Sequence, residues 1–286
     1  MKISAATKVA GVVGNPIAHS LSPVIHNAWI TAAGLDAAYF AAEPKRNGFR
    51  EFVQTPGPVA GFGAADFRGL NVTAPFKGEA LALADLASRR AQRAGAANLL
   101  IFDSGGRIRA DNTDGEGLLA AFSEQVAGFD PGAGPLVILG AGGAARGAVA
   151  AFLDAGAPGV RLVNRSTDRA AALAAEFGAT VAVVESHALT AALADANAII
   201  NATPAAPDIP LERAAPSTVV MDMVYRPLVT PFLSRAQASG LRTVDGLAML
   251  IGQARPSFTA FFGLEPPDVD VRAEALGCLA LKASRA

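Results

Sequence analysis

Small polar side chains that core packing does not require gather in four short segments, at residues 14–23, 71–77, 111–115 and 245–253. In the first segment, Ser22 followed by Pro23 is typical of a helix N-cap and the first helical residue. Ser20 is not needed for that cap. Because a helix N-terminus carries unpaired N–H groups and a partial positive charge, two hydroxyls beside it form a neutral cradle for a carboxylate. Ser20 and Ser22 therefore predict a site for a small acid.

The second segment ends on a lysine, Asn71-Val72-Thr73-Ala74-Pro75-Phe76-Lys77, where a short strand enters a polar turn. Only five of the 24 basic residues are lysines, so this position favours a titratable amine over a generic positive charge. The third segment, Asp111-Asn112-Thr113-Asp114-Gly115, places a carboxylate at Asp114. That carboxylate also fits an Asx turn, so both roles stay open for Asp114.

A glycine-rich loop, Gly140-Ala141-Gly142-Gly143-Ala144-Ala145, follows an apolar strand and opens a helix, the context expected of a dinucleotide-binding turn. Gly140 would make the tight turn, and Gly142 would let the backbone approach a pyrophosphate. Gly143 and Ala144 would offer the free N–H groups of the first helical turn to the phosphates. The alternative is a strand-to-helix turn that binds nothing.

The end of the next strand favours NADP over NAD. An NAD site has an Asp or Glu about 20 residues after the loop, which binds the ribose 2′-hydroxyl. Here the strand ends Val163-Asn164-Arg165-Ser166, without a carboxylate at its tip. Arg165 and Arg169 are four residues apart at a helix start, so both can face a 2′-phosphate. The alternative is a pair of solvated arginines, partly neutralised by Asp168.

Apolar runs alternate with Ala- and Leu-rich stretches along the chain, a rhythm that predicts an α/β fold with mainly parallel sheets. The first series has predicted strands at 9–13, 38–42 and 69–72, helices at 23–33 and 77–94, and a hairpin of 97–103 with 107–110. The second has strands at 136–139, 160–163, 180–184, 198–201 and 218–221, a helix to about residue 155 and another at 168–177.

Two domains follow from this order of elements. The Gly- and Pro-rich stretch 128–135 marks the entry to the second series, and the boundary is placed slightly earlier, at Asp114. The segment 245–253 returns the chain to the first domain. The predicted domains are 1–113 with 246–286, and 114–245.

Composition excludes several classes of protein. The 286 residues are 51% hydrophobic and 17% charged with a net charge of −1, and the basic residues are spread out, which argues against nucleic acid as a partner. No charge-free run reaches the roughly 18 residues of a membrane span, and the N-terminus lacks a secretory apolar region. The single cysteine, Cys278, fits a reducing compartment, so we expect a cytoplasmic protein. The three histidines show no metal-ligand spacing, and no metal is expected.

Eight motifs in one order resemble the shikimate dehydrogenase family, over essentially the whole chain: GNPIAHSLSP, NVTAPFK, DNTDG, GAGGAARG, NRS, NATP, DMVYRP and DGLAMLIGQA. The resemblance implies an N-terminal α/β substrate domain, completed by the C-terminal helices, and a Rossmann-like doubly wound domain for NADP. It also implies NADP-dependent, reversible reduction of 3-dehydroshikimate to shikimate, a reaction of chorismate and aromatic amino-acid biosynthesis.

The same resemblance assigns roles position by position. Lys77 and Asp114 are implied as the catalytic pair. The substrate is implied to contact Ser20, Ser22, Thr73, Lys77, Asn98, Asp114, Tyr225 and Gln253. The cofactor is implied to contact Gly140, Gly142, Gly143, Ala144, Asn164, Arg165, Ser166, Arg169, Met223 and Gly246.

Two departures from the family pattern bear on specificity. Ala97-Asn98-Leu99 stands where the family usually has Val-Asn-Thr, and Ala205-Ala206-Pro207-Asp208 replaces a Gly-Met-type turn after NATP. The alternatives are therefore a quinate or quinate/shikimate dehydrogenase, or a catalytically altered NADP-binding relative. The expected partner is a small-molecule substrate, and a homodimer is compatible with the sequence.

Overall fold

The computed structural model describes residue 4 and residues 6–54, 67–103 and 105–283. The chain divides into two compact units, Met1–Thr113 with Gln253–Ala286, and Asp114–Gly252. The second division lies inside helix α10 (Gly246–Phe262), later than the 245/246 division expected from the sequence. Because α10 runs unbroken through this point, no turn or change of composition marks the division.

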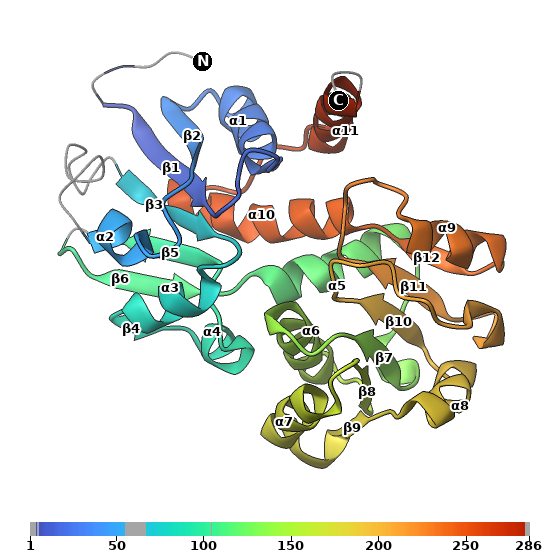
Figure 1. The fold of residues 1–286 in the computed structure, drawn as a ribbon. Helices are drawn as coiled ribbons and strands as arrows, with labels where there is room; N and C mark the ends of the chain where they lie inside the picture. The colour runs from blue at the N-terminus through green and yellow to red at the C-terminus, as the bar shows by residue number, and fades with distance from the viewer. Residues whose placement is uncertain (1–3, 5, 55–66, 104, 284–286) are drawn as a thin grey trace. The chain divides into compact units, whose positions relative to one another are not determined.

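The described residues of the first unit form a mixed six-stranded sheet in the order β2-β1-β3-β5-β6-β4 (Figure 1). Its strands are β1 (Lys8–Val13), β2 (Ala37–Ala42), β3 (Phe67–Val72), β4 (Leu86–Ala87), β5 (Leu99–Phe102) and β6 (Ile108–Asp111). Strand β1 pairs in parallel with β2 and β3, whereas β5 pairs antiparallel with β3 and β6. The predicted hairpin is confirmed, and it makes this sheet mixed where the general rhythm favoured a mainly parallel one.

The single helix predicted over 77–94 is wrong. The chain forms α3 (Lys77–Leu83), then β4, then α4 (Arg89–Ala94). A carboxylate oxygen of Asp85 accepts the N–H of Ile108 at 2.7 Å, and Ser88 Oγ caps α4 by accepting the N–H of Ala91 at 3.1 Å. These bonds to neighbouring elements outweigh the helix propensity of the Ala- and Leu-rich sequence.

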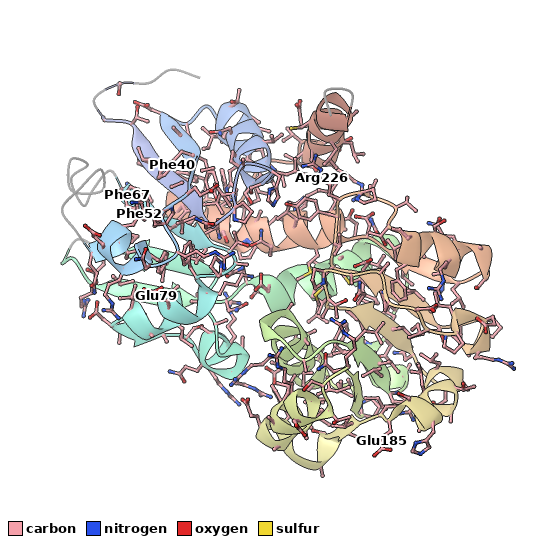
Figure 2. All side chains as sticks on the ribbon, viewed as in Figure 1. Phe40, Phe52, Phe67, Glu79, Glu185 and Arg226 are labelled. Atoms are coloured by element: carbon pink, nitrogen blue, oxygen red, sulfur yellow. The ribbon has the colours of Figure 1, made fainter. Side chains whose placement is uncertain are left out.

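One apolar cluster and one pair of helices pack the described part of the first unit together. Phe40, Phe52 and Phe67 lie on one side of it in Figure 2, and the ring centroids of Phe40 and Phe67 are 6.3 Å apart. Phe49 of α2 (Phe49–Gln54) stacks on Phe76 at 4.8 Å, directly before α3. Helices α1 (Ser22–Ala32) and α11 (Val271–Ala283) pack against each other (Figure 1). The C-terminal helix thus belongs to the same unit as the N-terminal strand.

The described residues of the second unit form a six-stranded sheet in the order β12-β11-β10-β7-β8-β9, with every pair parallel. Its strands are β7 (Leu136–Leu139), β8 (Val160–Val163), β9 (Val181–Val183), β10 (Ala198–Asn201), β11 (Val219–Asp222) and β12 (Arg242–Val244). The order reverses between β7 and β10, as in doubly wound sheets that bind ligands at the carboxyl ends of their strands. The five predicted strands are present, and β12 was not predicted.

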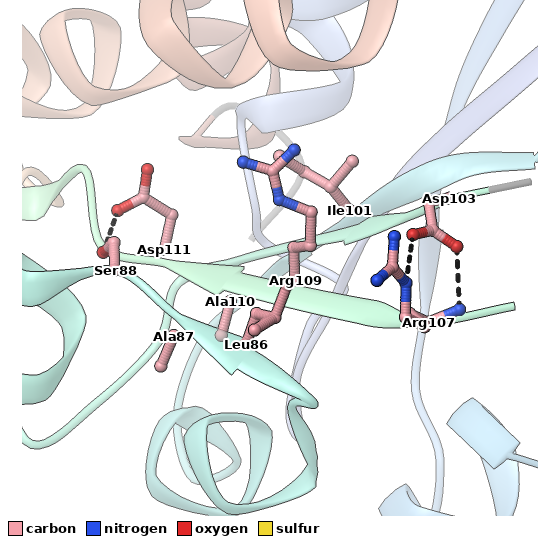
Figure 3. Close-up of a pocket in the computed structure, with 9 residues that line it drawn as sticks. All are labelled: Leu86, Ala87, Ser88, Ile101, Asp103, Arg107, Arg109, Ala110 and Asp111. Atoms are coloured by element: carbon pink, nitrogen blue, oxygen red, sulfur yellow. Dashed lines mark hydrogen bonds and ion pairs between the residues drawn. The ribbon is translucent and has the colours of Figure 1, made fainter. Parts of the chain in front are cut away.

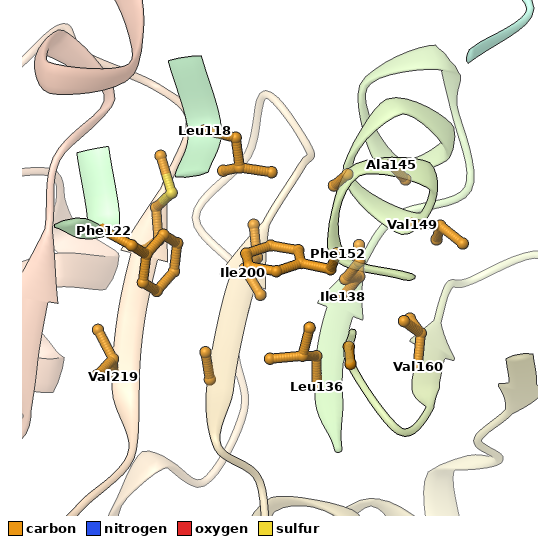
Figure 4. Close-up of a cluster of buried hydrophobic side chains, with 14 of the residues drawn as sticks. Leu118, Phe122, Leu136, Ile138, Ala145, Val149, Phe152, Val160, Ile200 and Val219 are labelled. Atoms are coloured by element: carbon orange, nitrogen blue, oxygen red, sulfur yellow. The ribbon is translucent and has the colours of Figure 1, made fainter. Parts of the chain in front are cut away.

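Helices cover both faces of this sheet, so its central strands are buried throughout. One face packs under α5 (Asp114–Gln125), α6 (Gly143–Asp154) and α7 (Thr167–Phe177), with Phe122 and Phe152 among the core residues drawn in Figure 4. The other face packs under α8 (Leu189–Ala194) and α9 (Pro231–Ala238), where Phe232 is fully buried. Ile138 and Val137 alternate between the two clusters, as strand geometry requires.

Candidate active site

The two serines of the first polar segment stand at the start of α1. Ser22 is the first helical residue and is buried, and its backbone N–H donates to Ser20 Oγ at 3.3 Å. The expected N-cap role of Ser22 is wrong, because Leu21 occupies the cap position without a side-chain hydrogen bond. Instead, the hydroxyl of Ser20 accepts the hydrogen bond from the backbone N–H of Ser22. Both hydroxyls thus lie beside the helix N-terminus, where an anion is favoured.

The second segment links β3 to α3 through a tight turn. Thr73 N–H donates to the carbonyl of Val13 at 2.9 Å, so the turn begins at the carboxyl end of β1. Lys77 is the first residue of α3, and its carbonyl accepts the N–H of Ala97 at 2.8 Å. The backbone of Lys77 is therefore fixed beside the residue that precedes Asn98.

Asn98, Thr113 and Gln253 form a buried polar cluster within the first unit. Asn98 Nδ2 donates to Thr113 Oγ1 at 2.9 Å and lies 3.2 Å from Gln253 Oε1. In return, Asn98 Oδ1 accepts the N–H of Thr113 at 2.8 Å. Thr113 Oγ1 also donates to the Gln253 carbonyl at 3.0 Å. Two of the predicted substrate residues, Asn98 and Gln253, are thus in contact although they lie far apart in the sequence.

A second set of buried groups extends this cluster, and sequence reasoning assigned no role to any of them. Asn71 Nδ2 donates to Ser257 Oγ at 2.8 Å and to the Asn98 carbonyl at 3.1 Å. Tyr39 Oη donates to Asn71 Oδ1 at 2.7 Å. Asn71 stood in a motif already noted, but only the tertiary structure shows that Tyr39 and Ser257 meet it.

His26 lies beside Tyr39 in an aromatic environment. Their rings stack with centroids 4.0 Å apart, and Trp29 approaches edge-on at 5.7 Å. His26 is fully buried, and neither ring nitrogen has a hydrogen-bond partner among the described residues. Because burial penalises the charged ring, it lowers the pKa of His26 to about 3. The imidazole is therefore neutral at physiological pH.

The glycine loop joins β7 to α6 in the second unit. Gly140 has φ +118°, and a side chain there would also meet Thr203 Cγ2 at 3.0 Å, so glycine is required by the fold itself. Gly142 and Gly143 differ, since a Cβ added at either would meet nothing within 4 Å. Gly142 also has an ordinary φ of −97°. The fold leaves open space where Ala144 and the first helical turn expose their N–H groups.

The end of β8, from which NADP was predicted over NAD, is arranged around Ser166. Its hydroxyl caps α7 by accepting the N–H of Arg169 at 3.4 Å, and its carbonyl accepts Asn164 Nδ2 at 2.9 Å. Arg165 and Arg169 are exposed, and neither has an ion-pair partner in the part of the chain that the structure describes. Both guanidinium groups are thus available to an anion at the carboxyl end of β8.

Met223, Tyr225 and Gly246 lie at or after the end of β11 and at the start of α10. A side chain at Gly246 would come within 2.5 Å of the Met223 carbonyl oxygen, so glycine is required for this close approach. Tyr225 is partly buried, and burial raises the pKa of its hydroxyl. The tyrosine is therefore protonated at neutral pH.

Lys77 and Asp114 belong to different units. Lys77 begins α3 of the first unit, and Asp114 begins α5 of the second. Ala97 and Leu99, the first departure from the family pattern, are both buried around β5. The second departure starts at Ala205, whose carbonyl accepts Asn201 Nδ2 at 3.1 Å.

A separate pocket of about 300 Å³ lies on the first unit (Figure 3). Its charged lining includes the ion pair of Arg107 with Asp103 at 2.8 Å, and Asp111, which is paired with Arg90 at 2.7 Å. None of the predicted site residues lines it. Within the described ranges, no cluster of His, Cys, Asp or Glu could hold a metal ion, and no helix is long and apolar enough to cross a membrane.

Family models match both parts of the chain. The model described as "Shikimate dehydrogenase substrate binding domain" matches residues 12–100, and the one described as "Shikimate / quinate 5-dehydrogenase" matches residues 132–226. A protein named "Shikimate dehydrogenase (NADP(+))" from Caulobacter vibrioides (strain NA1000 / CB15N) is 54% identical over 284 residues, covering 97% of this chain and 98% of that protein.

Solved structures agree with this match. Shikimate 5-dehydrogenase from Thermus thermophilus, in complex with NADP(H) and shikimate, has a TM-score of 0.83 at 35% identity and covers 95% of this chain and 99% of its own. Quinate dehydrogenase from Corynebacterium glutamicum, in complex with NAD, has a TM-score of 0.81 at 28% identity, with coverages of 96% and 99%. Near-complete coverage at 54% identity, together with both family models, places the chain in the shikimate dehydrogenase family.

Proposed function

We propose that this protein is an NADP-dependent shikimate dehydrogenase that reversibly reduces 3-dehydroshikimate to shikimate. The observation that carries the proposal is the near-full-length identity of 54% to a protein named as an NADP(+) shikimate dehydrogenase. Its place is then chorismate and aromatic amino-acid biosynthesis. The first unit, with the C-terminal helices, is assigned to the substrate and the second unit to the cofactor.

The residues of the second unit fit NADP. The open space over Gly142 and Gly143 allows a pyrophosphate to approach the backbone, and the first turn of α6 offers Gly143 and Ala144 N–H groups. Arg165 and Arg169 supply guanidinium groups for a 2′-phosphate, with Asn164 and Ser166 shaping the loop between them. Met223 and Gly246 are assigned to the nicotinamide end. When bound, NADP supplies the hydride acceptor or donor.

The residues of the first unit suit a small hydroxylated acid. Ser20 and Ser22 at the start of α1 are assigned to its carboxylate, because both hydroxyls stand at a helix N-terminus. Thr73, Asn98 and Gln253 are assigned to the ring hydroxyls, together with Asp114 and Tyr225 of the second unit. Because Thr113 and Gln253 hold the Asn98 side chain in one orientation, the remaining acceptor capacity of its oxygen would meet a substrate hydroxyl without a large loss of side-chain entropy.

The chain's own chemical task is one proton transfer. Oxidation of a ring hydroxyl removes its proton as the hydride leaves the same carbon, and reduction returns both. Lys77 is assigned as the group that takes and returns this proton, with Asp114 orienting it. A lysine suits this role because its amine can exchange a proton, which a guanidinium cannot do at neutral pH.

Cofactor reduction with shikimate and with quinate, each paired with NADP and with NAD, tests the proposal. We expect the highest kcat/KM for shikimate with NADP. Equal or higher kcat/KM values for quinate would show that the protein is a quinate or quinate/shikimate dehydrogenase. Absence of turnover with every pair would favour a catalytically altered relative.

Arg165→Ala is expected to weaken NADP binding by roughly 10- to 100-fold, the effect of losing one charge-assisted contact. NAD binding should change little, because NAD lacks the phosphate. The KM values for the two cofactors measure this difference. Arg213→Ala, which removes another exposed arginine of the same unit, is the matched control. Equal losses for NADP and NAD would contradict the assignment of Arg165.

Ser20→Ala is expected to raise the KM for shikimate roughly tenfold, with a smaller fall in kcat, since the carboxylate lies away from the reacting carbon. Ser20→Thr keeps a hydroxyl and should recover part of the loss. Steady-state kinetics at saturating NADP measure both constants. A change in the KM for NADP of the same size would show that the substitution disturbs more than substrate docking.

We also assign the protein to the cytoplasm, on its single cysteine, and propose a homodimer. Sedimentation equilibrium tests the oligomeric state, and a single monomeric species at micromolar concentration would contradict the dimer.

A further inference from the structure

Asp222 is a buried carboxylate at the carboxyl end of β11, with 1% of its surface exposed. Its Oδ1 accepts Asn201 Nδ2 and the N–H of Val224, both at 3.0 Å. Its Oδ2 accepts the hydroxyl of Thr230 at 2.6 Å, and Thr230 in turn caps α9. The carboxylate therefore forms hydrogen bonds with three parts of the unit. These are the end of β10, the loop that carries Met223 and Tyr225, and the start of α9.

Asn201, at the end of the neighbouring strand β10, holds the next loop in the same way. It is fully buried, and its Oδ1 accepts the N–H of Thr203 at 3.0 Å and the Thr203 hydroxyl at 2.7 Å. Thr203 lies against the cofactor turn, since its Cγ2 would be 3.0 Å from a Cβ at Gly140. Asn201 and Asp222 thus connect the ends of three adjacent strands, β7, β10 and β11.

Burial of the Asp222 carboxylate, taken by itself, lowers the free energy of unfolding. A buried carboxylate is unfavourable unless it is paired, and no Lys or Arg pairs with Asp222 in the described part of the chain. Burial also raises its pKa. Charged groups retained in the interior without a cation partner are frequent at functional sites.

On the proposed function, we infer that Asn201 and Asp222 are positioning residues, which set the 202–205 and 223–225 loops at the nicotinamide end of the NADP site. They act through Thr203 and through the backbone of Val224, between Met223 and Tyr225, and do not themselves touch the cofactor. The proposed adenosine end is formed by Arg165, which follows β8, and by Arg169 of α7, and no hydrogen bond found among the described residues joins it to this network.

That division gives a test that separates positioning from general stability. For Asp222→Ala, we expect NADPH affinity, measured by NADPH fluorescence, to fall roughly tenfold, the effect of losing the hydrogen bond that holds the Val224 N–H, one of the three that the carboxylate accepts. The affinity for 2′-AMP, which carries only the adenosine 2′-phosphate, should stay within about twofold. A general loosening of the unit would weaken both ligands together and would overturn the inference.

Asp222→Asn should recover most of the affinity. Its oxygen can still accept Asn201 Nδ2 and the Val224 N–H, and its amide can donate to Thr230 Oγ1. An Asp222→Asn protein as impaired as Asp222→Ala would contradict positioning by these hydrogen bonds. The control is Thr218→Val, directly before the opposite end of β11, where the fully buried Thr218 Oγ1 donates to the Ala196 carbonyl at 2.7 Å. It should lower the melting temperature and leave NADPH affinity unchanged.

If the Asp222→Ala protein does not fold, the Thr203→Val protein tests the inference in its place. This variant keeps the methyl group beside Gly140 and removes the hydroxyl that bonds Asn201, so NADPH affinity should fall about threefold while 2′-AMP affinity is kept. Thr203→Ser should restore it, and unchanged NADPH affinity in Thr203→Val would overturn the inference. Because NADPH binding needs no turnover, a failure of the proposed function is separate: it would appear as wild-type protein that binds NADPH but does not oxidise shikimate.

Discussion

Lys77→Ala is expected to lower kcat for shikimate oxidation by roughly 10²- to 10⁴-fold, the usual range for a positioned acid–base group. The amine is carried by the first residue of α3, whose backbone is fixed by the hydrogen bond from Ala97. If the amine only held a substrate hydroxyl, its loss would raise KM and leave kcat near the wild-type value. Steady-state kinetics at saturating NADP and varied shikimate separate these outcomes.

Lys77→Arg separates proton transfer from charge. The guanidinium keeps the positive charge but does not release a proton at neutral pH, so kcat should remain low while KM stays closer to the wild-type value. Lys45→Ala, at an exposed lysine of the same unit, should leave both constants unchanged. A near-normal kcat in Lys77→Ala would leave the residue as a substrate anchor only.

Acid should destabilise the first unit through His26. Its pKa is about 3 in the fold against 6.5 in the unfolded chain, so the fold favours the neutral ring. This contribution is fully present above pH 6.5 and is lost as the pH falls toward 3, because the unfolded chain then binds a proton that the folded chain does not. The slope approaches roughly 1.4 kcal/mol per pH unit below about pH 5.5, and the loss is about 2 kcal/mol between pH 6.5 and 4.5.

Urea unfolding at a series of pH values measures this slope, and Trp29 reports it locally. Trp29 is the only tryptophan of the chain and approaches the His26 ring at 5.7 Å. His26→Phe keeps an aromatic ring beside Tyr39 and removes the group that titrates. The free energy of unfolding of this variant should therefore fall less between pH 6.5 and 4.5 than that of the wild type, by the contribution of His26. His187→Gln, at an exposed histidine, is the control. If the free energy of unfolding changed with pH in the same way for wild type and His26→Phe, burial of His26 would not be the cause of the acid destabilisation.

The second unit was predictable from the sequence because its signals are local. Its central strands contain the apolar runs 136–139 and 198–200, and the glycines of the predicted cofactor-binding loop follow the first of them directly. Arg165 and Arg169 could be assigned from spacing alone, since four residues are about one helical turn. Strand β12 was missed because Arg242-Thr243-Val244 is short and mostly polar, and it becomes a strand through its pairing with β11.

The remainder depended on contacts between distant residues. Asp85 and Ser88 interrupt a helix-forming stretch because β6 offers hydrogen bonds that no local pattern contains. Asn71, Tyr39 and Ser257 meet only once β2, β3 and α10 are assembled. The sequence therefore offered candidates for ligand contact more readily than it offered the buried residues that fix their positions.

The place of Gln253 in the sequence bears on when each unit can be completed during synthesis of the chain. Asn98 and Thr113 are made early, but their partner Gln253 follows 155 residues after Asn98. By then every strand of the second unit has been translated, since β12 ends at Val244. A nascent chain can therefore complete the cofactor sheet while the first unit still lacks part of its buried polar cluster. The unit whose translation begins first is thus the one that receives its last interior residues later.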